Sequence, residues 1–100
     1  KEIIYVVNER LRPTNETVAF SLYYEFFEIQ DNRIPTTERL HNAETFKYLL
    51  IDRILADRYI KWLVSNNYLE FYKMGSNEQY QFTCSTLNDF VQKVMANVEA

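Results

Sequence analysis

The sequence predicts a mainly helical α+β fold in which a long helix leads directly into a β-hairpin. Apolar residues recur with helical spacing from Glu44 to about Asn66, and two runs that alternate apolar and polar residues follow. The single glycine, Gly75, lies between these runs, where a hairpin turn needs a residue that accepts positive φ. We therefore expect strands at 68–74 and 79–84, joined by a turn at 75–78.

Composition and charge restrict the class of protein. Of the 100 residues, 47% are hydrophobic and 25% are charged, which is typical of one globular domain, here residues 1–100. A single cysteine, Cys84, suits a reducing compartment, so we expect a cytoplasmic protein, or a nuclear one in a eukaryote. The apolar run at residues 3–7 is too short to span a bilayer, and no membrane partner is expected.

The amino-terminal third contains signals for two helices. Residues 1–11 have apolar residues at helical spacing but also a β-branched run that suits a strand, and we favour the helix. Thr14 or Asn15 can cap a second helix that runs to about Gln30. Its expected apolar face is wide and contains Val18, Ala19, Leu22, Tyr23, Phe26, Phe27 and Ile29.

A short helix and a long one follow. Residues 34–40 read as a short helix that opens with Pro35 and a threonine cap, and residues 41–43 as a turn. On a helical wheel from 44 to 66, the core face carries Ile51, Leu55, Tyr59, Trp62 and Leu63. The opposite face carries Lys47, Arg58, Lys61 and Ser65, with Ile54 among them, and Asp57 at its margin can pair with Lys61. This helix is unusually long, so a bend or break inside it stays open.

The last helix begins after the hairpin. Thr86 can cap it, with Asp89 placed to complete a capping box. Its apolar stripe must be buried against the chain's own core or against a second copy, and because most oligomers are two-fold we expect a homodimer. The stripe, and the expected dimer interface, consists of Leu87, Phe90, Val91, Val94, Met95 and Val98.

This order of elements resembles the winged-helix (winged helix-turn-helix) DNA-binding superfamily. The run from Arg58 to Phe71 looks like a recognition helix that ends in a polar turn and enters the wing, and Gln79–Thr83 looks like the return strand. The layout is also similar to the amino-terminal domains of DnaD-type replication proteins and to TubR-type partition adaptors. The resemblance implies a non-enzymatic protein of transcription regulation, replication or plasmid and phage maintenance.

The resemblance also implies a set of DNA contacts. The helix from 44 to 66 would enter a major groove, and the hairpin would reach the backbone or the minor groove. Duplex DNA is favoured, with single-stranded DNA as an alternative. The net charge of −3 and the acidic Glu78 at the wing depart from a strongly basic DNA-binding surface. The implied contacts are Arg39, Lys47, Arg58, Lys61, Ser65, Lys73, Ser76 and Asn77.

The cations of the long helix and several other polar and aromatic residues also have a simpler, structural interpretation. Cations on a helix are by default a solvated face, and His41 and Cys84 lack partners in sequence that would make a metal site or a nucleophile. Glu25 and Glu28 share a helix face that we expect to be solvent-exposed. Tyr24, Tyr68 and Tyr72 could stack on bases, although packing is the commoner role.

Two hypotheses follow. The first is a DNA-binding domain with no catalytic residues, metal or cofactor. The second is a winged helix that binds a protein partner within a larger assembly, which the acidic balance and the 16% aromatic content favour.

Overall fold

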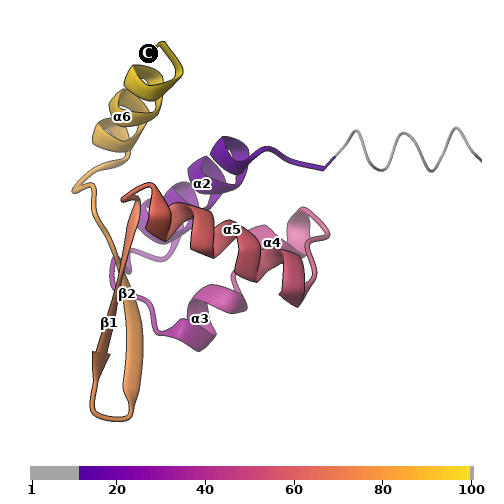
Figure 1. Ribbon diagram of the computed structural model, residues 1–100, viewed down its shortest axis with the longest axis vertical. Coiled ribbons are helices and arrows are strands. Elements are labelled where there is room, and N and C mark those ends of the chain that lie inside the picture. The colour runs from indigo at the N-terminus through magenta and orange to yellow at the C-terminus, as the bar shows by residue number, and fades with distance from the viewer. Residues whose placement is uncertain (1–11, 100) are drawn as a thin grey trace, which may run out of the picture.

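The computed structural model describes residues 12–99, and the side chains of residues 12–97. The prediction for residues 1–11 therefore lies outside the described part of the chain. The fold is α+β, with helices followed by a two-stranded antiparallel hairpin and a final helix. The hairpin and α6 (Leu87–Glu99) project from opposite ends of the helical body (Figure 1).

The first described helix is confirmed in extent but changes its winding. α2 (Asn15–Tyr24) begins after Thr14, whose side chain accepts a hydrogen bond from the Thr17 N–H at 3.1 Å. It continues as a π-helical segment, η1 (Glu25–Ile29), in which the Gln30 N–H donates to the Glu25 carbonyl at 2.8 Å. The wider turn shifts the apolar register. Ile29, predicted inside the stripe, is therefore 67% exposed, whereas Glu25, predicted to face solvent, is only 4% exposed.

The stretch from Glu44 to Asn66, predicted as one helix in which a break stayed open, contains two helices. α4 (Glu44–Tyr48) ends in a Schellman motif, in which the Ile51 N–H donates to the Phe46 carbonyl at 2.8 Å and Leu50 takes a φ of +58°. α5 (Arg53–Ser65) then starts anew, because the Asp52 side chain accepts from the Leu55 N–H at 2.8 Å. Neither glycine nor proline marks this break in the sequence.

Leu50 adopts a backbone conformation that an L-residue with a Cβ disfavours, and 91% of it is exposed. We expect Leu50→Gly to raise the free energy of unfolding by about 0.5–1 kcal/mol, since relief of the strained φ exceeds the entropic penalty of glycine. Leu50→Ala is the control, because it removes the same exposed side chain and keeps the strain. Equal stability of the two variants in urea denaturation would contradict the prediction.

The short helix α3 (Thr37–His41) lies before α4, and its threonine cap is as predicted, but residues 34–36, predicted to be helical, are not. The Thr36 hydroxyl oxygen accepts from the Arg39 N–H at 3.1 Å, directly after Pro35. Leu40 is fully buried, as expected. The chain then turns at 42–43 and enters α4 at Glu44, so the predicted turn is also confirmed.

The hairpin is tighter than predicted. β1 (Leu69–Met74) and β2 (Asn77–Phe82) pair from Leu69↔Phe82 to Met74↔Asn77, which leaves only Gly75 and Ser76 in the loop. Gly75 has the expected positive φ, +63°. Such a two-residue loop matches the twist of the strands. The return strand therefore begins two residues earlier than 79 and ends before Cys84.

A third segment lies along the outer edge of β2. The Tyr80 N–H donates to the Pro35 carbonyl at 2.8 Å, and the Phe82 N–H donates to the Arg33 carbonyl at 3.1 Å. Thr36 forms an isolated bridge with Gln79. These contacts connect the segment before α3 to the base of the hairpin. The hairpin beyond Leu69 is exposed on β1 and extends away from the body (Figure 1).

The core is built around Tyr23. Its ring stacks on Phe90 of α6 with centroids 4.1 Å apart and meets Phe82 of β2 edge-on at 4.7 Å. Its hydroxyl donates to the Tyr68 carbonyl at 2.7 Å. Burial raises the pKa of the Tyr23 hydroxyl above its ordinary value, against hydrogen bonds from Thr83 and Cys84 that lower it. One aromatic side chain thus joins α2, the hairpin and α6.

Candidate functional site

The outward face of α5 is the first candidate surface. Ala56, Tyr59, Ile60 and Leu63 point into the core. Of the predicted contacts, the structure brings Arg58, Lys61 and Ser65 together on the exposed side, in agreement with the wheel. Ile54 lies on the same side, also in agreement with the wheel. Arg53 is exposed at the first residue of the helix, but helical geometry places it about 80° around the axis from Lys61.

One carboxylate lies within this face. Lys61 Nζ is 3.4 Å from an Asp57 oxygen, which confirms the predicted i, i+4 pair. His41 Nε2 is 3.5 Å from the other Asp57 oxygen, and His41 Nδ1 is 2.8 Å from the Thr37 carbonyl oxygen. Partial burial of the Asp57 carboxyl opposes ionisation, but hydrogen bonds from Lys61 and His41 outweigh it and lower its pKa. His41 therefore links α3 to α5, as a polar residue of the helix–turn region.

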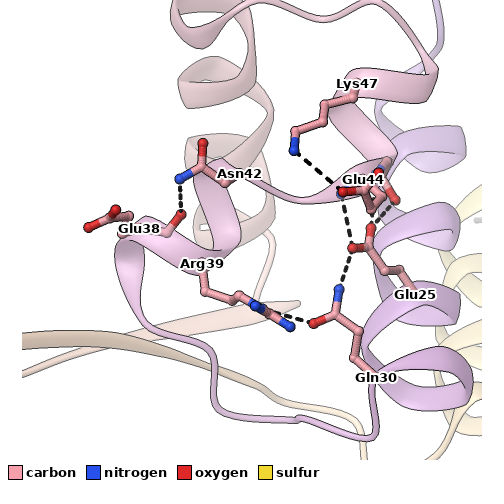
Figure 2. Close-up of polar contacts among 8 residues, drawn as sticks. Glu25, Gln30, Glu38, Arg39, Asn42, Glu44 and Lys47 are labelled. Carbon is pink, nitrogen blue, oxygen red and sulfur yellow. Dashed lines mark hydrogen bonds and ion pairs between the residues drawn. The ribbon is translucent and has the colours of Figure 1, made fainter.

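Lys47 and Arg39 belong to a different cluster. Because the helix breaks at Leu50, Lys47 lies on α4, where its Nζ is 3.4 Å from a Glu44 carboxylate oxygen. Arg39 donates from Nε to the Gln30 side-chain oxygen at 3.0 Å, and thus reaches towards the end of η1 (Figure 2). His41, two residues later, reaches α5 instead. The structure therefore does not place Lys47 and Arg39 on the outward face of α5.

The centre of this second cluster is the buried carboxylate of Glu25. It accepts hydrogen bonds from the Glu44 N–H at 3.0 Å, the Thr45 N–H at 2.9 Å and the Thr45 hydroxyl at 2.7 Å (Figure 2). Ala43, at the N-cap position of α4, supplies no side-chain cap. Glu25 thus caps α4 from another helix, with a charge that suits the positive end of the helix dipole.

Gln30 extends this network from Glu25 to Arg39. Its amide NH₂ donates to the Glu25 carboxylate, and its amide oxygen accepts from the guanidinium (Figure 2). An amide between an anion and a cation has only one favourable orientation, because the carboxylate needs a donor and the guanidinium needs an acceptor. Sequence reasoning missed Glu25 and Gln30. Glu25 reaches partners 19 and 20 residues away, so no local pattern indicates its role.

A groove lies beside this cluster, between α2, η1 and α4. Its volume is about 690 Å³. Four exposed apolar or aromatic side chains line it, two from α2 and one each from η1 and α4, with Glu44 and Lys47 among the polar lining residues. The four are Phe20, Tyr24, Ile29 and Tyr48. This concave, mainly apolar surface is a second candidate surface.

The predicted wing residues are exposed on the hairpin. Lys73 lies opposite Glu78 in the strand pairing, so its charge is partly balanced. Ser76 and Asn77 are at or next to the loop. Of the tyrosines considered for base stacking, Tyr24 and Tyr72 are exposed, whereas Tyr68 is not and has the packing role that was favoured. Tyr68 is buried and stacks on Trp62 with centroids 5.5 Å apart.

Most residues of the apolar stripe of α6 pack against the core of the same chain. Phe90 is buried against Tyr23, and three further stripe residues pack partly on the same core. Those three are Leu87, Val91 and Val94. Met95 is half-exposed, and the side chain of Val98 lies outside the described part. In this arrangement, Phe90 is not accessible to a second copy.

Within residues 12–97, no three His, Cys, Asp or Glu side chains are close enough to hold a metal ion. Cys84 is half-buried, and its backbone N–H donates to the Tyr23 hydroxyl at 3.4 Å. None of the helices in the described part has both the length and the apolar character to cross a membrane.

Comparison with known proteins identifies no relative: no protein-family model, no curated protein and no solved structure matches the chain.

Proposed function

We propose that this chain is a non-enzymatic winged-helix domain that binds nucleic acid, preferentially duplex DNA, through the outward face of α5. The observation that carries the proposal is the position of Arg58 and Lys61 together on the exposed face of a helix that a tight turn precedes and a projecting hairpin follows. In a helix-turn-helix, such a helix enters the major groove. α4 and α5 would form the helix pair.

The hairpin supports the same proposal. The segment 33–36 pairs with β2, so the hairpin is fixed to the body at its base while its tip stays exposed. A wing of this kind can contact the backbone or the minor groove beside the helix. Lys73, Ser76 and Asn77 would supply these contacts, which position the protein more than they select a sequence.

The acidic net charge is compatible with this function because charge is unevenly distributed. The outward face of α5 carries the two cations Arg58 and Lys61 and the carboxylate of Asp57, and the exposed Arg53 lies at the start of the same helix. Glu25 is buried and its carboxylate is occupied with capping α4. Phosphates respond to the local charge that faces them. The processes that fit are transcription regulation, replication, and plasmid or phage maintenance, with the protein acting as a homodimer.

The first test compares lysines in matched environments. Lys61 and Lys47 each lie 3.4 Å from a carboxylate on their own helix, but only Lys61 is on the α5 face. We expect Lys61→Ala and Arg58→Ala each to weaken binding to random duplex DNA on the order of tenfold near 0.1 M salt. Each substitution should also make the plot of the logarithm of the binding constant against the logarithm of the salt concentration less steep, by a slope change of about 1. Lys47→Ala should leave both quantities unchanged.

Fluorescence anisotropy across a salt series measures these quantities, with single-stranded DNA of the same length as a parallel probe. The double variant Arg58→Ala with Lys61→Ala should show the sum of the two slope changes. Binding that does not depend on salt, or an equal loss in the Lys47 variant, would overturn the proposal.

The groove between α2, η1 and α4 favours a second candidate function, a protein-interaction module. Its exposed Tyr24 and Tyr48 are the kind of side chain that anchors protein interfaces. In this case, one protein should be recovered with the wild-type chain in stoichiometric amount. It should be lost with Tyr48→Ala and kept with Lys61→Ala, while duplex DNA at low salt is not bound.

A further inference from the structure

An exposed isoleucine lies on the outward face of α5, at the amino-terminal end of the helix. Ile54 is the second residue of the helix and is 75% exposed. It is neither among the side chains packed on the core nor among the residues that line the grooves of residues 12–97. On a wheel of 100° per residue, it projects between Arg58 and Lys61. Packing within the described chain therefore does not account for an apolar residue here.

Ile54 lies at the end of α5 that reaches the bases first in a helix-turn-helix. Asp52 caps α5, so Ile54 belongs to the first turn. In a helix-turn-helix, the amino-terminal residues of the second helix reach the base edges, while cations around them contact phosphates. Arg53 precedes Ile54, and Arg58 and Lys61 follow it by one and two turns. In such a pose, Ile54 would face the floor of the groove.

We propose that Ile54 makes the α5 surface selective for thymine, by contact with the C5-methyl group in the major groove. This inference rests on the proposed function of α5. The thymine methyl is the apolar feature among the base edges of the major groove, whose other groups are hydrogen-bond donors and acceptors. An aliphatic side chain without a hydrogen-bonding group can recognise only that feature. The ligand class is thus duplex DNA with A·T pairs at the position that α5 reads.

Replacement of thymine by deoxyuridine tests the inference directly, since it removes only the methyl group. Duplexes would first be enriched from a random pool by the wild-type protein, then prepared with thymine or with deoxyuridine. We expect deoxyuridine to weaken wild-type binding about fourfold for each contacted methyl, which is the effect of one buried methyl-sized group. Ile54→Ala should bind both duplexes equally, and Ile54→Val should retain most of the discrimination.

Two controls separate this inference from the function on which it rests. Ile54→Ala should bind DNA with the same salt dependence as the wild type. Arg58→Ala should bind with a weaker salt dependence but keep the wild-type ratio of affinities for the thymine and deoxyuridine duplexes. Salt-dependent binding with a ratio near one for the wild type would overturn the role of Ile54 and leave DNA binding in place. Absence of salt-dependent binding would overturn both. Because Ile54 is exposed, the thermal unfolding midpoint of its variants should match that of the wild type.

Discussion

Glu25→Ala should lower the free energy of unfolding by about 3–5 kcal/mol, the range for removal of one partner from a buried charged network. The substitution leaves the Glu44 N–H, the Thr45 N–H and the Thr45 hydroxyl without their acceptor. It also leaves α4 without a cap, because Ala43 provides none. Urea denaturation measures the total loss, and amide hydrogen exchange at Glu44 and Thr45 locates it.

The isosteric variant Glu25→Gln tests the loss of hydrogen-bond acceptors alone, because it keeps the volume of the side chain. All four groups around the carboxylate donate hydrogen bonds, so an amide NH₂ in its place would face donors on one side. We expect a loss of about 2–3 kcal/mol. Glu28→Gln is the matched control, an exposed glutamate three residues along the same segment, and should change stability by less than about 0.5 kcal/mol. Equal stability of the two glutamine variants would contradict this account.

Tyr23→Ala should also be strongly destabilising, by about 3–5 kcal/mol, as for other large aromatic residues removed from a core. The ring contacts Phe90, Phe82 and Phe27, and thus holds α6 and the hairpin on α2. Tyr23→Phe keeps the ring but removes the hydroxyl's hydrogen bond to the Tyr68 carbonyl, which then accepts only from the Thr83 N–H, at a cost of about 1–2 kcal/mol. Thermal and urea unfolding of the two variants separate the ring from the hydroxyl. A smaller loss for the alanine variant than for the phenylalanine variant would refute this assignment.

The sequence alone predicted the elements whose signals are local. Thr14, Thr36 and Thr86 cap helices as expected, because an N-cap bonds within three residues of itself. Gly75 lies in the hairpin loop because that position needs a positive φ. The pairing of Asp57 with Lys61 and the exposed positions of Arg58 and Lys61 followed from helical spacing.

Only the tertiary structure decided the features that depend on distant partners. The break between α4 and α5 places a leucine at a φ that usually requires glycine, so the helix's length left a break open but no residue type indicated its position. The π-helical winding of η1 turned Glu25 inward and Ile29 outward, and the buried carboxylate found its donors about 20 residues away. The break at Leu50 also separated Lys47 from Arg58 and Lys61. A helical wheel places side chains around one axis, whereas Lys47 and Arg58 lie on two different helices.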